Sequence, residues 1–150
     1  MTRINSAISV KLLTDEHLLA EHREIKRLPF NFKLRKDKGL GCDSPPEFKL
    51  GTGHVMFFAD RGLFTLKRYV DIRNECLIRG FSIEDYSSNW EVYCDYVKDY
   101  IPTNKEHFLL INRIAERLMQ STKQYWHYCG NRITKEQAVK LLSEDYVPVR

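Results

Sequence analysis

The residues at the very start of the sequence could supply a nucleophile. Met1 is followed by Thr2, whose small side chain permits removal of the initiator methionine and exposure of the Thr2 α-amine. An α-amino group has a pKa of about 7.7–8.0, against about 10.4 for lysine, so a useful fraction is unprotonated at neutral pH. Nearby cations lower that pKa further. Such an amine can attack a sugar C1′ and form a Schiff base, but Met-Thr is a common start and does not by itself indicate this chemistry.

A carboxylate, Glu24, lies among cations, with Arg23 before it and Lys26 and Arg27 shortly after it. On a helix Arg23 and Arg27 share one face, because they are four residues apart. A carboxylate on a basic face suits general acid–base catalysis, or the stabilisation of a cationic, sugar-like transition state. The alternative is an ordinary surface ion pair between Glu24 and a neighbouring base.

A second basic pair, Arg113 and Arg117, also has the spacing of one helix face and precedes an aromatic segment with Tyr125, Trp126 and Tyr128. Cations beside aromatic rings suit contact with phosphates together with stacking or wedging at unstacked bases. The alternative is an aromatic cluster that covers the core.

The element that carries Glu24 is predicted to be a helix beginning near Thr14. Thr14 is a good N-cap, and the acidic residues Asp15 and Glu16 suit the positive end of the helix dipole. Pro29 is expected to end or kink this helix, because it lacks a backbone donor and clashes with the preceding turn. Residues 33–48 are expected to form a basic stretch and then a turn-rich loop.

Two more long helices are predicted. One runs from about Asp60 to Arg79 and stops at Gly80, and the other follows Pro102. The buried side of the latter is expected to consist of Phe108, Leu109, Ile111, Ile114, Ala115, Leu118 and Met119.

Three short segments complete the prediction. Thr134 and Gln137 form a capping box that opens a last helix, to about Ser143. Residues 54–58 fit either a strand or a helix, and residues 89–97 fit a short helix with Trp90 and Tyr93 facing inward. Little strand alternation is present, so the predicted fold class is all-α. We expect a compact single domain over residues 1–150, with three main helices, short helices and long loops, and with residues 131–150 as a C-terminal extension.

The composition is that of an ordinary globular protein, with 43% hydrophobic and 29% charged residues. No apolar run approaches the length of a membrane span, and the first residues lack the apolar region of a signal peptide, so we expect a cytoplasmic protein. The four cysteines show no C-x-x-C pair and no histidine at zinc-ligand spacing, so we expect no metal site.

The charge is unevenly distributed. Residues 1–40 hold nine Lys and Arg against five Asp and Glu, and residues 103–150 hold eight against five, whereas residues 41–102 hold seven against ten. Two basic ends around an acidic middle suggest that both ends face one polyanion. A mixed-charge solvated surface is the alternative.

Taken in order, the segments resemble the phage-type pyrimidine-dimer DNA glycosylases and abasic-site lyases, the dimer-specific endonuclease V family. The matching segments are TRIN at 2–5, DEHLLAEHREIKRL at 15–28, residues 50–83 with GTGHVMFFADRGLF and ECLIRGFSI, DYIP at 99–102, and then the second arginine pair and the aromatic segment. Together they cover roughly two-thirds of the chain.

The resemblance implies a compact all-α domain that binds duplex DNA containing UV photoproducts or abasic sites. It implies cleavage of the glycosidic bond of the 5′ pyrimidine in a cyclobutane dimer, followed by strand cleavage through β-elimination. It implies no metal and no organic cofactor. We further expect a monomer with no membrane contact, in a viral or bacterial setting.

Matched by position, the resemblance makes Thr2 the amine nucleophile and Glu24 the essential carboxylate. It implies that further residues contact DNA or shape the site: Arg3, His17, Arg23, Arg27, Arg113 and Arg117. The aromatic segment adds Tyr125, Trp126 and Tyr128 to the expected DNA contacts. His54 matches a family histidine, and we expect it to have a structural role.

The sequence departs from the family at several places. Glu16 stands where the family has an uncharged amide, His22 replaces a tyrosine, Arg117 replaces a lysine, and His127 and Cys129 interrupt a more basic and aromatic tail. Residues 30–48, 84–98 and 131–150 align poorly. Three alternatives therefore stay open: the same amine chemistry on another lesion (an abasic site or a formamidopyrimidine), a non-catalytic DNA-binding module, and a helical partner-binding protein.

Overall fold

The computed structural model describes residues 3–41, 44–93 and 98–143. Thr2, the predicted nucleophile, lies outside these ranges. The elements of the described residues are a 3-10 helix η1 (Val10–Leu12), helices α1 (Asp15–Ile25), α2 (Arg27–Asp37), α3 (His54–Phe57) and α4 (Gly62–Ile78), a second 3-10 helix η2 (Ser87–Val92), helix α5 (Asn104–Gln120), strands β1 (Tyr125–Tyr128) and β2 (Asn131–Thr134), and helix α6 (Lys135–Ser143). The protein is therefore mainly helical, as predicted.

Helix α1 begins and ends where the sequence indicates. The Thr14 hydroxyl caps its first turn by accepting from the His17 N–H at 3.2 Å. The helix ends at Ile25, four residues before Pro29. A proline ring clashes with the carbonyl of the residue four positions before it, so a helix that contains Pro29 cannot run unbroken through Ile25. The chain then starts a new helix, α2, and Pro29 lies in its first turn, where the missing N–H costs no intrahelical hydrogen bond.

The structure refines two expectations. The basic stretch was given no secondary structure from the sequence, and over residues 33–37 it belongs to α2, since a run of Lys, Leu and Arg residues favours a helix. On α5, Ile114 and Leu118 are buried as predicted, together with Leu110, whereas Phe108, Leu109 and Met119 were expected to be buried and are 64%, 41% and 49% exposed. Many apolar residues lie on two sides of α5, so the sequence pattern did not single out the buried side.

The all-α expectation is corrected by a β-hairpin. Strands β1 and β2 pair antiparallel, with Tyr125 opposite Thr134 and Tyr128 opposite Asn131. Cys129 and Gly130 connect them with positive φ angles of 51° and 82°, the backbone of a two-residue type I′ turn. The aromatic segment is therefore a strand.

The short helices agree with their sequence signals. Residues 54–58, which fitted either a strand or a helix, open with α3. Of the helix predicted over 89–97, residues 89–92 belong to η2 with Trp90 buried, Tyr93 is half-buried, and residues 94–97 lie outside the described ranges. The capping box of α6 is reciprocal, because the Gln137 N–H donates to Thr134 Oγ1 at 3.1 Å and the Thr134 N–H donates to Gln137 Oε1 at 2.9 Å.

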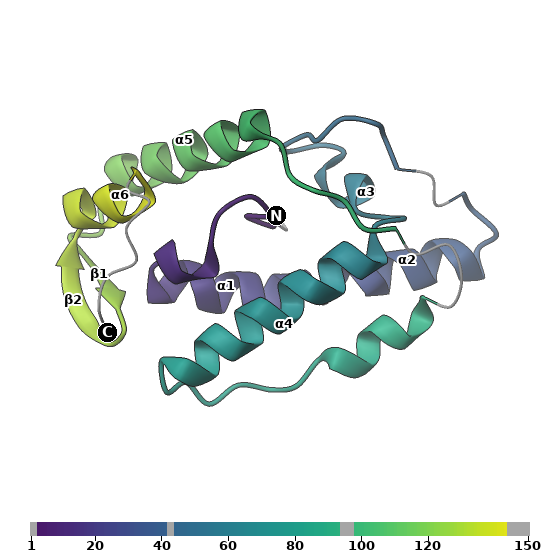
Figure 1. The fold of residues 1–150 in the computed structure, drawn as a ribbon, viewed down its shortest axis with the longest axis horizontal. Helices are drawn as coiled ribbons and strands as arrows, with labels where there is room; N and C mark the ends of the chain where they lie inside the picture. Colours follow the sequence, from purple (N-terminus) through teal and green to yellow (C-terminus); the bar gives the residue numbers. More distant parts are fainter. Residues whose placement is uncertain (1–2, 42–43, 94–97, 144–150) are drawn as a thin grey trace.

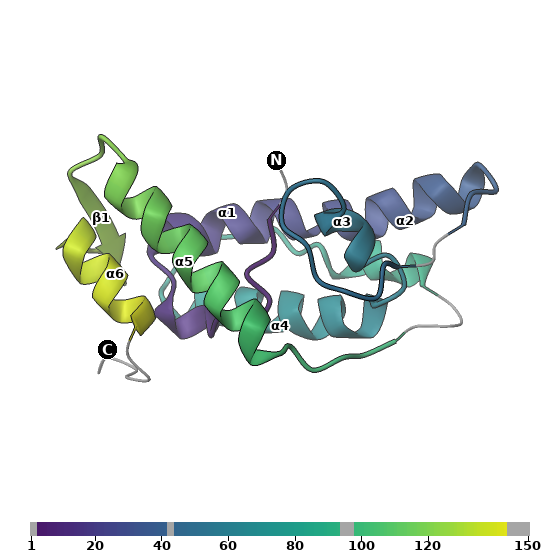
Figure 2. The same cartoon turned by 90° about the horizontal axis from the view of Figure 1, so that it is seen from above.

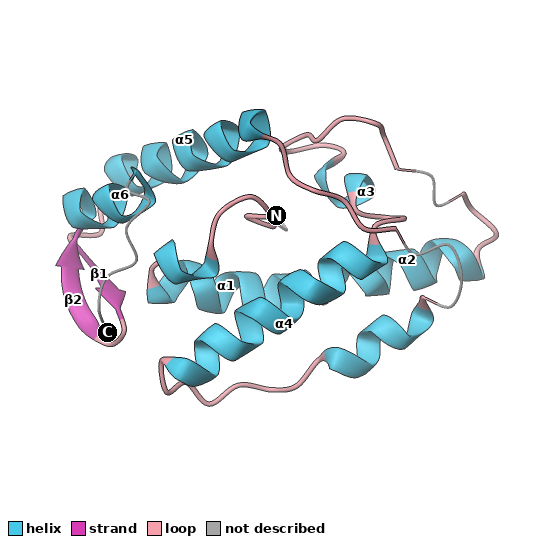
Figure 3. Cartoon of the chain, in the orientation of Figure 1, coloured by secondary structure: helices cyan, strands magenta, loops and turns pink. Residues whose placement is uncertain are grey.

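The helices form two groups with the N-terminal segment between them. Helix α4 packs on α1, α6 packs on α5, and β1 lies against α1. Figures 1 and 2 show α5 crossing over α1 and α4, with the first residues of the chain running between α5 and the other two helices. Figure 3 shows the hairpin at the end of the molecule beside α6. None of the described helices is long and apolar enough to cross a membrane.

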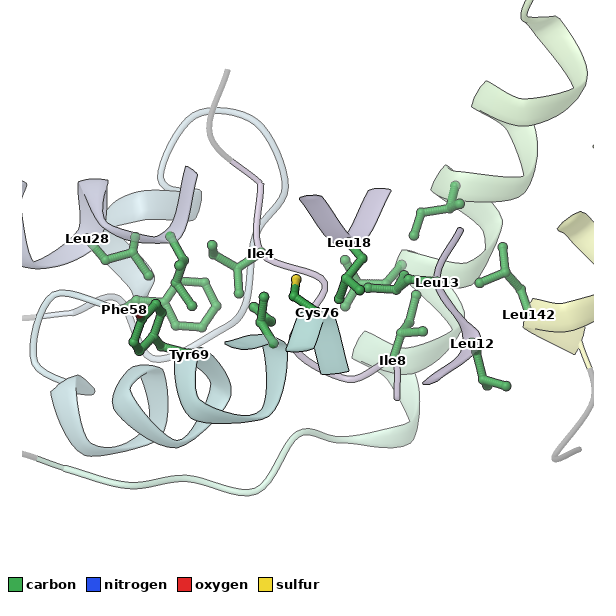
Figure 4. Packing of buried hydrophobic residues seen from close by; sticks show 14 of the residues in the cluster. Ile4, Ile8, Leu12, Leu13, Leu18, Leu28, Phe58, Tyr69, Cys76 and Leu142 are labelled. Atoms are coloured by element: carbon green, nitrogen blue, oxygen red, sulfur yellow. The ribbon is translucent and has the colours of Figure 1, made fainter. Parts of the chain in front are cut away.

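The N-terminal segment is part of the core. Ile4 and Ile8 are 0% and 1% exposed and belong to the same hydrophobic cluster as Leu18 of α1 and Tyr69 of α4. Figure 4 shows their side chains among those of α1 and α4. The segment from Ile4 to Ile8 is therefore fixed by packing against the helices.

Candidate active site

Side chains from four different helices bind the backbone of the N-terminal segment. These contacts are Ile4 N–H to His54 Nε2 of α3 at 2.8 Å, Asn5 N–H to Glu21 Oε1 of α1 at 3.0 Å, Ala7 C=O to His107 Nδ1 of α5 at 2.9 Å, and Ile8 C=O to Arg68 of α4 at 2.6 Å. Within the segment the Ile8 N–H donates to the Asn5 carbonyl at 3.0 Å and closes a turn. Other buried polar groups of the segment have no such backbone partner, so side chains provide it. Four side chains, each from a different helix, thus hold residues 4–8 in place.

The Glu21 carboxylate is the centre of this arrangement. Its Oε1 accepts from both the backbone N–H and the side-chain amide of Asn5, at 3.0 and 2.8 Å. Arg68 donates to both carboxylate oxygens, at 2.7 and 3.1 Å. The Glu21 and Arg68 side chains are 1% and 7% exposed, so each charge is neutralised inside the protein.

Arg3 begins the described chain and belongs to a cluster of cations. It is half-buried, and its burial together with nearby Arg117 and Arg113 lowers its pKa to about 10. The second arginine pair, on α5, thus lies beside the start of the chain, more than a hundred residues away in sequence. Three guanidinium groups at one place create a strongly positive surface, which suits a polyanion.

Glu24 lies on the face of α1 that meets the N-terminal segment. His17, Glu21 and Glu24 follow one another at four and three residues, so they share one helix face. Glu24 pairs with Arg27 at 2.9 Å, with the glutamate 29% and the arginine 56% exposed. Arg23 is exposed one turn before Arg27. The face therefore carries a carboxylate with cations around it, next to the residue that anchors Asn5.

The aromatic segment is docked on the first turns of α1. The rings of His17 and Trp126 stack, with centroids 5.1 Å apart and planes 10° from parallel. Lys123 lies 4.6 Å from the centre of the Trp126 ring. Burial lowers the pKa of His17 to about 4, although the Glu16 and Glu21 charges raise it, and the Arg3 and Arg117 charges lower it further. His17 is therefore neutral at physiological pH and joins the basic cluster to the aromatic hairpin.

The two tyrosines of the hairpin have different surroundings. Tyr125 is 47% exposed, with the Arg132 guanidinium 4.5 Å from its ring centre, so it is available to a ligand. Tyr128 is buried, donates its hydroxyl to the Lys11 carbonyl at 2.7 Å and packs against Arg79. Tyr128 supports the hairpin from inside.

Asp15 and Glu16 hold the hairpin, which the sequence did not reveal. Asp15 accepts from the N–H groups of Cys129 and Gly130, at 3.0 and 2.8 Å, so its carboxylate binds the turn. Glu16 contacts His127 Nδ1 at 2.6 Å. Burial opposes ionisation of Glu16, but the hydrogen bonds from His127 outweigh it, and the pKa of Glu16 lies below its usual value. In the sequence these two residues stand out only as acidic residues in the first turn of a helix, and their interaction with the helix dipole is sufficient to explain that position.

Within the described residues, no group of three or more His, Cys, Asp and Glu could hold a metal ion. The positive surface, the neutral His17, Glu24 and the anchored residues 4–8 thus form the candidate site. His17, Glu24 and the arginines are candidates from the sequence, whereas the buried anchors Glu21 and Arg68 were not among those candidates. The spacing of Glu21 between His17 and Glu24 was the available signal.

Comparison with known families gives one match. A family model described as pyrimidine dimer DNA glycosylase matches residues 1–89. The matched part includes the N-terminal segment, α1 with Glu21 and Glu24, and α4 with Arg68. It ends before α5 and the hairpin, so Arg113, Arg117 and the aromatic residues lie outside it.

Proposed function

The chain belongs to the pyrimidine dimer DNA glycosylase family, and we propose that it excises the 5′ pyrimidine of a UV-induced cyclobutane dimer and then cleaves the strand as an abasic-site lyase. Membership makes it a DNA repair glycosylase and gives DNA as its substrate. The Schiff base, the lyase step and the residues that carry them are the content of the proposal.

The main support is the anchoring of the N-terminal segment. Four helices contribute side chains that hold residues 4–8, and these residues lead back to Arg3 at the positive surface. Thr2 is joined to Arg3 by one peptide bond, and adjacent Cα atoms are about 3.8 Å apart. An enzyme that uses its own terminus as a nucleophile needs that terminus fixed at the substrate surface, because a misplacement of about 1 Å can cost a factor of about 100 in rate.

The chemistry follows from the α-amine. Cations such as Arg3, Arg113 and Arg117 disfavour its protonated form and so lower its pKa below the usual range of about 7.7–8.0. The nitrogen lone pair attacks C1′, the bond from C1′ to the base nitrogen breaks, and the base leaves with that electron pair. The nitrogen gives up its two protons, one to the departing base and one to O4′ as the C1′–O4′ bond breaks, and the product is an imine between the nitrogen and C1′. The imine acidifies the C2′ proton, whose removal expels the 3′ phosphate by β-elimination.

Glu24 has the second catalytic role in this proposal. Positive charge develops on the sugar as the base leaves, and a carboxylate beside C1′ stabilises it. Glu24 is partly exposed on a basic face, where its charge repels phosphates and so weakens DNA binding. Its cost to binding is offset by its effect on the transition state.

The remaining residues bind and deform the duplex. Arg3, Arg23, Arg27, Arg113 and Arg117 are the proposed phosphate contacts. On the hairpin, Trp126 stacks on His17 and Tyr125 lies beside Arg132. Both rings are proposed to pack against bases or sugars opened at the lesion. A dimer stacks poorly, so local unstacking costs less there than in intact DNA.

Borohydride trapping tests the proposal. Borohydride reduces an imine to a stable amine, so the enzyme should become covalently attached to UV-irradiated duplex, and peptide mapping should place the adduct on the N-terminal peptide. Undamaged duplex should give no adduct, and neither should protein that retains Met1. An adduct on a lysine side chain, or strand cleavage without any adduct, would overturn the proposed nucleophile. Parallel duplexes with a dimer, an abasic site or a formamidopyrimidine would rank the lesions.

A further inference from the structure

His54 holds the N-terminal segment through an unprotonated ring nitrogen. The Ile4 N–H donates to His54 Nε2 at 2.8 Å, and His54 Nδ1 lies 2.8 Å from the Lys49 carbonyl oxygen. A backbone N–H can only donate and a carbonyl can only accept, so Nε2 is bare and Nδ1 carries the proton. These two contacts select one neutral tautomer of the ring.

The surroundings of the ring favour this neutral form. His54 is 2% exposed, and the rings of Phe48 and Phe58 stand edge-on to it, with centroids 5.4 and 5.3 Å away. Burial lowers the pKa of His54; the carbonyl bonded to Nδ1 raises it, the Arg3 charge lowers it and the Glu21 charge raises it. The net direction is downward, so the ring stays neutral at physiological pH.

The next peptide unit is fixed as well. The Asn5 N–H donates to Glu21 at 3.0 Å, directly after the Ile4 N–H has been bound by His54. Two consecutive peptide planes are therefore held from two helices, α3 and α1. Because each peptide unit is planar and rigid, two fixed planes set the direction in which the chain continues towards its start.

We propose that His54 is a positioning residue for the N-terminal amine, which it places by fixing the Ile4 peptide through its bare Nε2. The inference rests on the proposed function, because it requires the amine of Thr2 to be the nucleophile. His54 touches neither the substrate nor the amine. A protonated ring would present an N–H to the Ile4 N–H, two donors facing each other, and would release the segment. Neutral His54 is thus the active form.

Two substitutions separate the two ring nitrogens. In His54→Asn the side-chain amide can still donate to the Lys49 carbonyl, but no acceptor reaches the Ile4 N–H. In His54→Gln the side-chain oxygen reaches the place of Nε2 and can accept from Ile4. We expect His54→Asn to slow single-turnover excision by about 10- to 100-fold with an unchanged Kd for damaged duplex, and His54→Gln to recover most of that loss.

A destabilised control keeps a structural effect apart from positioning. Ile72→Ala removes fully buried core atoms of α4 and leaves in place the four side chains that bind the backbone of the N-terminal segment. Below its unfolding temperature it should excise at the wild-type rate. If His54→Asn behaves like Ile72→Ala, or if it loses DNA affinity and keeps the single-turnover rate, the positioning role is refuted. If the wild-type enzyme gives no N-terminal adduct in the trapping experiment, the proposed function itself fails, which is a separate result.

The pH dependence of excision gives a measurement that holds even where His54→Asn fails to fold. In the wild type, acid protonates both the amine and His54, so the logarithm of the single-turnover rate should fall below pH 6.5 with a slope that rises from 1 towards 2. In His54→Gln the proton on His54 is absent while the amine and the other histidines titrate as before, so the slope should be lower than in the wild type at the same pH. Equal slopes in the two proteins would overturn the proposal.

Discussion

Glu21 and Arg68 form a buried ion pair between α1 and α4, with Nε and Oε2 2.7 Å apart, and the same carboxylate binds Asn5. The pair thus joins two main helices to the start of the chain. Burying two charges costs desolvation energy, which only close pairing and further hydrogen bonds offset. Here the Asn5 donors and the Ile8 carbonyl supply those bonds.

Removing one partner of this ion pair should therefore destabilise the protein strongly. Arg68→Met leaves the Glu21 charge buried without its main partner, and we expect the free energy of unfolding to fall by about 3–5 kcal/mol. Urea denaturation measures this change. Lys98→Met is the control, since it removes an ion pair with Asp60 in which the lysine is 67% exposed, and such pairs contribute about 1 kcal/mol or less. Similar losses in the two variants would show that the buried pair is not an anchor.

The hairpin turn offers a stabilising substitution. Cys129 has a φ of 51°, in the left-handed region that asparagine tolerates and most side chains avoid. We expect Cys129→Asn to stabilise the protein by about 0.5 kcal/mol, because Asn-Gly is the preferred pair of a type I′ turn. Gly130→Ala, at a φ of 82°, should instead destabilise it by about 1 kcal/mol. Thermal unfolding checks both, and a rise in Tm for Gly130→Ala would contradict the turn geometry.

The hairpin also shows why part of the fold was not predictable. Helix α1 and helix α6 follow from local signals, namely the Thr14 cap and the Thr134 capping box, which need only neighbouring residues. The turn of the hairpin is a Cys-Gly pair with no strong local preference. Its backbone is bound by Asp15, more than a hundred residues earlier. Such long-range partners are not visible in a sequence pattern.

Some residues of the candidate site could likewise be predicted from the sequence, and others could not. Glu24 and the arginines were predicted because reactive and phosphate-binding groups are recognisable by type and spacing. Glu21 and Arg68 were missed, because a charged residue in a sequence is read as exposed until a buried partner 47 positions away is known. Trp126 was predicted at the site, but its stacking on His17 depends on the docking of the hairpin.

Three histidines should have pKa values below the usual value of about 6.5. Burial lowers the pKa of His17 to about 4 and also lowers those of His54 and His22. Each binds a proton more readily in the unfolded chain, whose pKa is about 6.5. Their contribution to stability is thus complete above pH 6.5 and is lost as pH falls towards the folded values, down to about 4 for His17.

NMR titration of the ring resonances measures these pKa values directly, and we expect His17 to titrate lowest. The free energy of unfolding should fall from pH 6.5 to 4, and His17→Gln should reduce the slope because one fewer proton is taken up on unfolding. A His17 ring that titrates near 6.5 would mean that it is not stacked and buried against Trp126.

Glu24→Gln should separate binding from chemistry. The amide keeps the shape of the side chain and removes its charge, so damaged duplex should bind as well as before or slightly better. Excision should fall by at least about 100-fold, the scale of a lost catalytic carboxylate. Glu91→Gln is the control, because it makes the same change at an exposed glutamate of η2, outside the candidate site. Rapid excision by Glu24→Gln would show that Glu24 is only the ion-pair partner of Arg27.

The salt dependence of binding should identify the phosphate contacts. Each cation that neutralises a phosphate releases about 0.9 counterion, so Arg117→Gln should lower the slope of log K against log salt concentration by about 1. Arg113→Gln should act alike, because both arginines lie beside Arg3 and lower its pKa. Arg73→Gln is the control, since Arg73 lies 3.9 Å from Asp85 in the acidic middle of the chain and should leave the slope unchanged. The slope depends on the number of contacts and not on the lesion, so undamaged duplex should show the same differences. A slope that changes equally in all three variants would mean that only net charge matters, and that the arginines of α5 do not face the DNA.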